Sequence, residues 1–134
     1  MGFKDISQIA GSAMAAQSVR LNTIASNLAN ADVSAGSEAE AYRARKPVFA
    51  AAMDNAAGGG VRVLDVVQSA EPLRRVHEPD NPKADAEGMV YYTNVNEVAE
   101  MADMMSASRA FETNVEVLGR IKSMQASLLK LGES

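Results

Sequence analysis

The longest periodic stretch of the chain lies in its last third, from Asn94 to Leu131. Apolar residues recur there at steps of three and four, the spacing of one face of an α-helix. The stretch holds no proline and only one glycine, so the pattern predicts a single helix. At about 1.5 Å per residue this helix would be roughly 55 Å long, longer than a compact domain of this size, so one end should need a partner. Its apolar face consists of Met101, Met104, Ala107, Phe111, Val115, Leu118, Ile121, Met124 and Leu128.

The ends of this predicted helix carry capping signals. Asn94 can cap the start, with Glu97 three positions later as in a capping box. Gly132 stands where a C-terminal cap is expected. Acidic residues gather in the first turns and basic residues in the last ones, which is the distribution that the helix dipole favours.

A second, weaker helical pattern runs from Asp5 to Asn30. Alanine fills much of its apolar face, so the face lets another backbone approach closely but buries little area, at about 25 cal/mol per Å². Because most helical stability comes from tertiary packing, we expect this segment to form fully only against a neighbour. The face consists of Ile6, Ile9, Ala13, Ala16 or Gln17, Leu21, Ile24 and Leu28.

The first half of the middle segment contains a loop and two candidate strands. Residues 31–40 are small and polar without a period, which predicts a loop. Residues 42–49 partly alternate and predict a strand with Pro47 near its edge. The glycines at 58–60 predict a turn or mobile tip, and the alternating valines that follow, Val61 and Val63, predict a half-buried strand.

The second half contains two further short strand candidates, residues 73–76 and 89–92. Between them lies an acidic loop that is restricted by two prolines. The chain is therefore predicted to be mainly α with a small β-rich middle. Its N-terminal helix should pair with the long C-terminal helix, antiparallel or parallel, in a coiled-coil-like bundle with an irregular or β-hairpin insertion. The predicted domains are a discontinuous helical one, residues 1–30 and 94–134, and the middle segment, residues 31–93.

Composition favours helix contacts over a thick core. Of the 134 residues, 47% are hydrophobic but only 4% aromatic, and the eight methionines suit adaptable packing surfaces. The net charge of −4 and the lack of a basic stripe disfavour nucleic-acid binding. No apolar run is long enough to insert into a membrane. The N-terminus lacks the apolar core of a cleaved signal peptide.

Candidate catalytic and metal-binding residues are few. The only histidine is His77, which a Ser-His-Asp arrangement would require, and we interpret it as structural. Asp80, Asp85 and Glu87 do not have EF-hand spacing, so a solvated acidic loop is the better interpretation. The three glycines lack the Lys-Ser/Thr ending of a phosphate-binding loop. We expect no enzyme activity and no cofactor.

A short basic cluster near the first strand has two interpretations. Arg43, Arg45 and Lys46 form it. Such a cluster is usually a solvated strand face, but it could also form salt bridges with an acidic partner.

Motifs at both ends resemble the flagellar axial proteins, which build the rod, hook and filament junctions. Residues 20–30, RLNTIASNLAN, are similar to the N-terminal signature of that family, and residues 100–115, EMADMMSASRAFETNV, to its C-terminal counterpart. Residues 42–46, 60–63 and 82–88 are similar in order and spacing to the proximal rod proteins. Residues 31–42, Asn81 and Thr93 depart from the family pattern, which leaves the middle loops less defined.

The resemblance implies a structural subunit of the bacterial flagellar basal-body rod. Such a subunit is exported through the flagellar type III apparatus without a cleaved signal and polymerises through its terminal helices in the periplasm. The implied partners are copies of itself, the other proximal and distal rod subunits, the rod-base protein that joins the MS ring, and the export apparatus.

On this interpretation the helix faces are subunit contacts. Asn27, Asn30 and Asn114 could also form hydrogen bonds with backbone or side-chain amides across these contacts. An alternative that the residues leave open is a soluble helical adaptor or secretion-associated chaperone. The predicted packing residues are Ile6, Leu21, Ile24, Asn27, Leu28, Asn30, Met101, Met104, Met105, Phe111, Asn114, Val115, Leu118 and Ile121.

Overall fold

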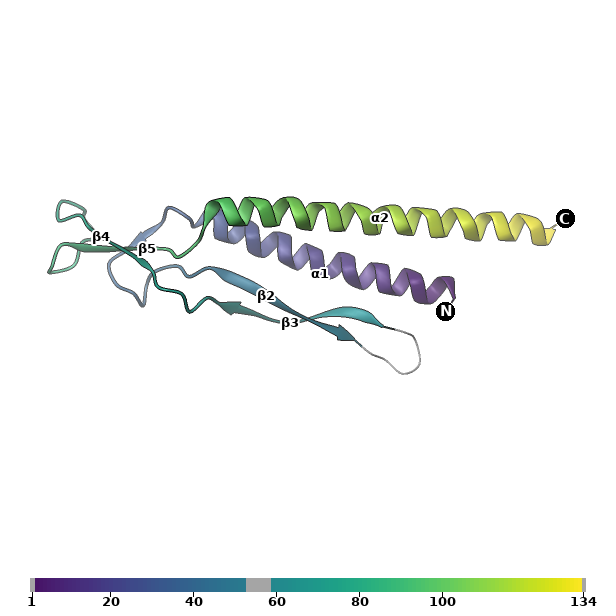
Figure 1. Ribbon diagram of the computed structural model, residues 1–134, viewed down its shortest axis with the longest axis horizontal. Coiled ribbons are helices and arrows are strands. Elements are labelled where there is room, and N and C mark those ends of the chain that lie inside the picture. Colours follow the sequence, from purple (N-terminus) through teal and green to yellow (C-terminus); the bar gives the residue numbers. More distant parts are fainter. Residues whose placement is uncertain (1, 53–58, 134) are drawn as a thin grey trace.

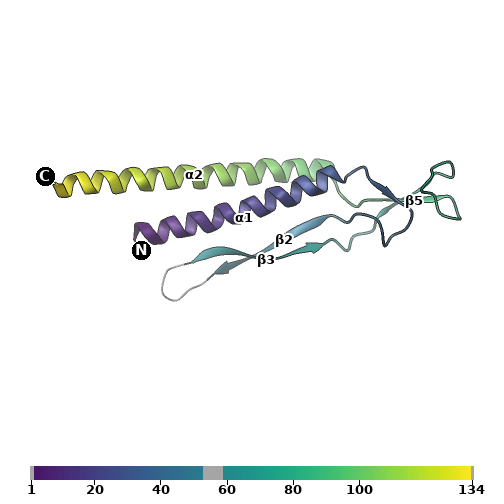
Figure 2. The same cartoon turned by 180° about the vertical axis from the view of Figure 1, so that it is seen from behind.

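The computed structural model describes residues 2–52 and 59–133. The molecule is elongated and has three parallel layers along most of its length: helix α2, helix α1 and a pair of strands, β2 and β3, with α1 in the middle (Figures 1 and 2). A small sheet forms the end away from both termini. The predicted architecture, two helices around a β-rich middle, is confirmed.

The two helices, α1 (Phe3–Ala29) and α2 (Glu97–Glu133), are antiparallel neighbours. An ion pair between Arg20 and Asp103 joins them near the small sheet. Because α1 has 27 residues and α2 has 37, the C-terminal end of α2 extends past the start of α1 (Figure 1).

The contact between the helices follows a heptad spacing on α2. Glu100, Ala107 and Ile121 are buried at intervals of seven or fourteen residues, and Asn114, between the last two, is half-buried. A repeat of 3.5 residues keeps one face of a helix toward a coiled-coil partner. The buried residues of α1 in this region include alanines, Ala10 and Ala16, and Ile24, which fits close approach of the two backbones.

The predicted apolar face of α2 is only partly covered by α1. Met101 and Val115 are 54% and 46% exposed and lie outside the seam with α1. The prediction followed hydrophobicity alone, whereas the heptad spacing places two polar residues, Glu100 and Asn114, in the seam.

The predicted caps of α2 are corrected as well. The helix starts at Glu97, and the Oδ1 atom of Asn96 accepts the first-turn bond from the Ala99 amide at 3.1 Å. Asn94 instead accepts a bond from the Ala44 amide at 2.7 Å, so it ties the loop before β2 to the start of α2. Gly132 lies within α2 and does not cap it.

Strands β2 (Arg45–Ala52) and β3 (Gly60–Gln68) form an antiparallel pair with a bulge between Val48 and Phe49. The pair packs against α1. The first strand begins three residues later than predicted. The glycine turn predicted at 58–60 falls partly outside the described residues, because Gly58 lies beyond them and Gly60 belongs to β3.

Gly60 allows close contact between β3 and α1. A Cβ atom at this position would lie 3.0 Å from the Ser12 Oγ atom. The same hydroxyl accepts a hydrogen bond from the Val61 amide at 3.0 Å. The small side chains on both elements thus place a strand edge directly on the helix.

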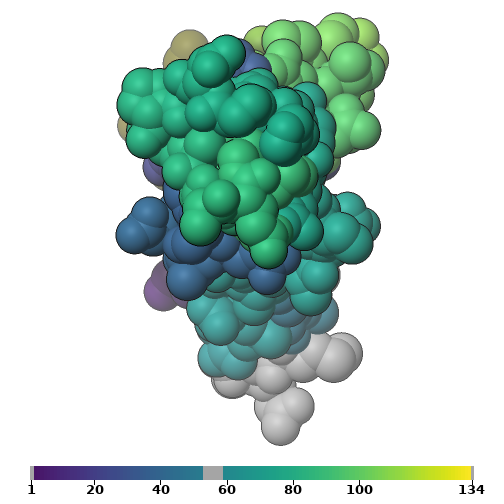
Figure 3. Space-filling view, turned by 90° about the vertical axis from the view of Figure 1, so that its left-hand side faces the viewer, coloured from purple at the N-terminus to yellow at the C-terminus, as the bar shows by residue number. Residues whose placement is uncertain are grey.

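The small sheet has the strand order β1-β5-β4, with β1 (Ser34–Ala35), β4 (Arg74–His77) and β5 (Met89–Tyr92). The two short strands predicted near these positions are confirmed, while β1 lies in a segment predicted as a loop. Seen from this end, the β4–β5 region stands in front of the rest of the molecule (Figure 3).

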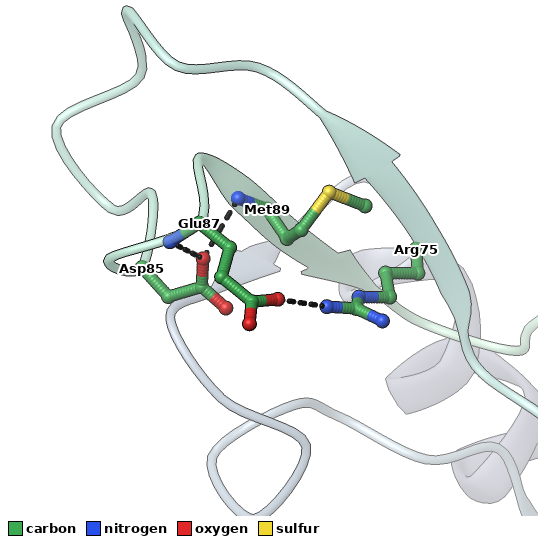
Figure 4. A network of polar contacts seen from close by, with 4 residues as sticks. All are labelled: Arg75, Asp85, Glu87 and Met89. Carbon is green, nitrogen blue, oxygen red and sulfur yellow. Dashed lines mark hydrogen bonds and ion pairs between the residues drawn. The ribbon is translucent and has the colours of Figure 1, made fainter.

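The turn before β5 is held by two carboxylates. Asp85 Oδ1 accepts bonds from the backbone amides of Glu87 and Met89, both at 2.9 Å. The Glu87 carboxylate in turn pairs with Arg75 on β4 at 3.0 Å (Figure 4). The predicted acidic loop is therefore a hydrogen-bonded turn.

Gly88→Ala should lower the free energy of unfolding by about 1–2 kcal/mol, because Gly88 has a φ of +79° and an L-residue is strained there. The new Cβ would also lie 3.0 Å from His77 Cε1. As a control, Gly119→Ala should raise stability by up to about 1 kcal/mol, since the added methyl group meets no atom within 4 Å beyond its chain neighbours and its own helix backbone. Urea denaturation measures both. Equal destabilisation by the two variants would contradict the assigned turn.

Candidate functional site

The candidate functional sites are apolar surfaces on the long helix. His77 is exposed at the end of β4. Within residues 2–52 and 59–133, no group of three or more His, Asp or Glu side chains is placed to hold a metal ion. In the same part of the chain no helix has the length and apolar character needed to cross a membrane.

One apolar surface, the outer stripe, runs along the side of α2 away from α1. It consists of Val98, Met101, Met105 and Val115, which are between 46% and 78% exposed. Val98 and Met105 are seven residues apart, and Met101 and Val115 are fourteen residues apart. The two pairs are offset by three or four residues, so all four side chains share one side of the helix. Three of the predicted packing residues belong to this stripe and contribute little to the seam with α1.

The second surface is the helix tail, residues 122–131 of α2. The seven-residue spacing of Glu100, Ala107, Asn114 and Ile121 continues here at Leu128, with Met124 one turn before it, but both side chains are more than half exposed. A shallow groove lies between the start of α1 and the helix tail. It is lined by Phe3, Gln125, Leu128 and Leu129. The face that α1 covers in the first part of α2 is thus largely uncovered in the last part.

The other predicted packing residues lie within the subunit. Three are buried: Ile24, Asn27 and Ile121. The half-buried ones are Ile6, Leu21, Leu28, Asn30, Met104, Phe111, Asn114 and Leu118.

Asn27 joins three segments of one chain. Its Nδ2 atom donates to the Arg45 carbonyl, and its Oδ1 atom accepts from the Arg45 amide, both at 2.9 Å. The Tyr42 hydroxyl also donates to Oδ1, at 2.8 Å. Asn27 is only 1% exposed, so this cluster fixes the end of α1 against the start of β2. The sequence placed Tyr42 at the start of the predicted strand 42–49, but no local pattern predicts its hydrogen bond to Asn27.

The two other predicted asparagines bond to their own helix or its end. Asn30 donates to the Ser26 carbonyl and Asn114 to the Ala110 carbonyl, both at 2.8 Å. These are local bonds between positions four residues apart, so within the subunit both amides act on their own helix turn.

The basic cluster is divided between two roles. Arg43 donates to the carbonyl of Glu71 at 3.1 Å and so holds the chain after β3. Arg45 and Lys46 are exposed, and the Arg45 guanidinium lies 5.4 Å from the centre of the Tyr42 ring. The interpretation as a solvated strand face fits these two residues.

The small sheet contains an acid coupled to a phenol. The Asn81 side-chain amide donates a hydrogen bond to the Glu78 carboxylate at 3.0 Å, and the Tyr92 hydroxyl donates a second one to it at 2.9 Å. These bonds, first from Asn81 and then from Tyr92, lower the pKa of Glu78 below its ordinary value of 4.5, with a further contribution from Arg74. The bond to Glu78 raises the pKa of Tyr92.

Comparison with known proteins gives a consistent family assignment. The family model "Flagella basal body rod protein" matches residues 8–35, and "Flagellar basal body rod FlgEFG protein C-terminal" matches residues 86–131. These segments contain most of α1 and α2.

Curated relatives match along the whole chain. The flagellar basal-body rod protein FlgC of Escherichia coli O157:H7 is 52% identical over 134 residues, covering 99% of this chain and 100% of its own. FlgC of Salmonella typhimurium strain LT2 is 50% identical with the same coverage. FlgC of Borreliella burgdorferi is 34% identical over 149 residues, covering 98% of both chains. The relatives' names describe structural rod proteins and not enzymes or adaptors.

Asn27→Ala should destabilise the fold by about 2–3 kcal/mol, because it leaves buried backbone groups without partners. Asn22→Ala, at an exposed position on the same helix, should change stability by less than about 0.5 kcal/mol. Urea denaturation measures the difference, and hydrogen exchange at the Arg45 amide should accelerate only in the first variant. Similar behaviour of both variants would contradict the anchoring role.

Tyr92→Phe should raise the pKa of Glu78 toward 4.5, because the carboxylate loses one hydrogen-bond donor. Folding lowers the pKa of Glu78, so the bonds to its carboxylate stabilise the small sheet at a pH above the ordinary pKa of Glu78. This stabilisation is lost in acid, as the pH falls through the lowered pKa and the carboxylate protonates. Carbon NMR titration of the Glu78 carboxyl group measures the shift. A pKa that is the same in both proteins would contradict the assigned cause.

Proposed function

This chain belongs to the FlgC family of flagellar basal-body rod proteins, and we propose that it polymerises into the proximal rod through its two terminal helices. As a member of this family it is a structural subunit of the flagellar basal body that assembles with other rod proteins. In the proposal, residues 1–30 and 94–134 form the axial core, and residues 31–93 lie outside it.

The proposal includes a route and a set of partners. The chain passes through the flagellar type III apparatus unfolded and without a cleaved signal, and it assembles in the periplasm. Its neighbours are further copies, the other proximal and distal rod subunits, and the rod-base protein at the MS ring. The thin alanine face of α1 supports coupled folding and assembly, because a helix that buries little area alone gains stability when a partner adds to it.

The observation that carries the proposal is the uncovered seam on the helix tail. Leu128 continues the seven-residue spacing of the seam with α1 and Met124 lies one turn before it, yet they are 53% and 54% exposed. A row of exposed large apolar side chains on a helix is characteristic of a protein contact. The outer stripe adds a second row on the same helix, so α2 has apolar residues for neighbours on two sides.

Leu128→Asp tests this contact in a flagellated bacterium whose own gene is replaced by the variant. It should lower incorporation into basal bodies by at least about tenfold, because burial of an unpaired charge in the seam costs more than 1.4 kcal/mol. Ser123→Asp is the control. It adds the same charge five residues away, about 140° around the helix. Rods are counted in isolated basal bodies.

Export should be the same for both variants, because an unfolded chain does not need the seam. The amount of exported protein therefore separates a failure of export from a failure of assembly. Normal incorporation of Leu128→Asp would show that the helix tail is not a subunit contact.

A further inference from the structure

Glu100 is a largely buried acid whose carboxylate oxygens still reach solvent. It is 9% exposed and is the only charged side chain among the buried residues that the structure describes. The three other buried polar side chains, Thr23, Asn27 and Thr93, all form hydrogen bonds. The Glu100 carboxylate forms no hydrogen bond or ion pair with any described residue. A neighbour that packed over these oxygens would remove them from water, where a carboxylate is costly unless something pairs with it.

Glu100 lines a shallow groove between Lys46 of β2 and the first turns of α2. Its oxygen atoms are not fully enclosed. The groove has a volume of about 560 Å³ and is lined by Lys46, Ala99, Glu100, Ala102, Asp103 and Ser106. Asp103 already pairs with Arg20, and Lys46 forms no ion pair with Glu100. The groove therefore presents one unpaired acid and small side chains on its α2 side and one lysine on its β2 side, and the α2 side fits a closely packed helix that carries a cation.

The chain itself carries such a helix surface around Lys122. This lysine is exposed and has no ion pair among the described residues. Gly119 precedes it by three positions and Ala126 follows by four, so two small residues flank it on one side of α2. Beyond its chain neighbours and its own helix backbone, an added Cβ at Gly119 would meet no atom within 4 Å, so this side of the helix is open to a neighbour. The nearby Arg120, by contrast, already pairs with Glu116 at 2.7 Å.

We propose that the groove over Glu100 binds the Lys122 region of α2 from a second copy of this chain, with Lys122 pairing with the Glu100 carboxylate. This inference rests on the proposed polymerisation and assigns one of its contacts. The two patches lie roughly 33 Å apart along α2. Because each copy offers one patch to each of two neighbours, the contact is heterologous and extends into an open assembly instead of closing into a dimer.

Cysteine crosslinking tests the contact in assembled basal bodies. The chain has no cysteine, and Ala102 and Ala126 are roughly 36 Å apart on one helix, too far for a disulfide within a subunit. Ala102→Cys combined with Ala126→Cys should give crosslinked dimers and higher multimers upon mild oxidation. Ala102→Cys combined with Ser127→Cys is the control, because Ser127 lies about 140° around the helix from Lys122. It should give at least about tenfold less product.

A charge exchange tests the ion pair. Glu100→Lys and Lys122→Glu should each lower incorporation about tenfold, since each places like charges together. The double variant should recover to within about threefold of the unmodified chain. Glu100→Gln preserves the side-chain shape and should still lower incorporation severalfold, although its folding stability should not fall.

The outcomes separate the two proposals. Rods that form normally without the 102–126 crosslink, or a double variant no better than the single ones, would overturn the Glu100 contact and leave polymerisation through the helices intact. Normal incorporation of Glu100→Gln would also overturn it. Normal incorporation of Leu128→Asp would instead count against the proposed use of the helix tail.

Discussion

The placement of the strand pair depends on the side chain of Asn27. Its amide contacts both backbone groups of Arg45 and the Tyr42 hydroxyl, and it is almost completely buried. A buried amide with all of these bonds is stabilising, but it becomes costly when a partner is lost. The cluster therefore specifies one position for β2 relative to the helices. Through β2 it also places Lys46 on the wall of the groove over Glu100.

The two helices differ in length and in the size of their apolar side chains, and this difference determines how much of α2 the chain itself can cover. Helix α1 brings several small side chains to the seam, which allows close approach but provides limited buried area. Helix α2 is longer and carries large apolar residues past the end of α1. A subunit built in this way is incompletely covered by its own chain, and the same feature that makes it a poor free-standing domain makes it a suitable assembly component.

The sequence was informative where structure is local. The helical periods located α1 and α2 to within a few residues, and alternation located the short strands. Asn94 illustrates what local reasoning misses. It has the correct residue type for a cap, but tertiary bonds to Ala44 and Glu71 engage it, and Asn96 takes the capping role. Hydrophobicity likewise placed Met101 on the packing face of α2. That Glu100 is buried instead depends on how α1 and β2 approach α2, which local sequence does not show. The groove combines residues from β2 and α2, so no single stretch of sequence could predict it.

The edges of the β2–β3 pair have a consequence for how copies of this chain can meet. Among the residues that the structure describes, each of the two strands has one side without a strand partner, and such edges invite strand addition from other chains. Here Asn27 occupies the outward groups of Arg45, Pro47 offers no amide, Ser12 accepts from Val61, and Asp65 accepts from Val66 at 2.8 Å. These side chains leave fewer backbone groups for β-aggregation. The edges of this strand pair are therefore less open to strand addition from other copies of the chain.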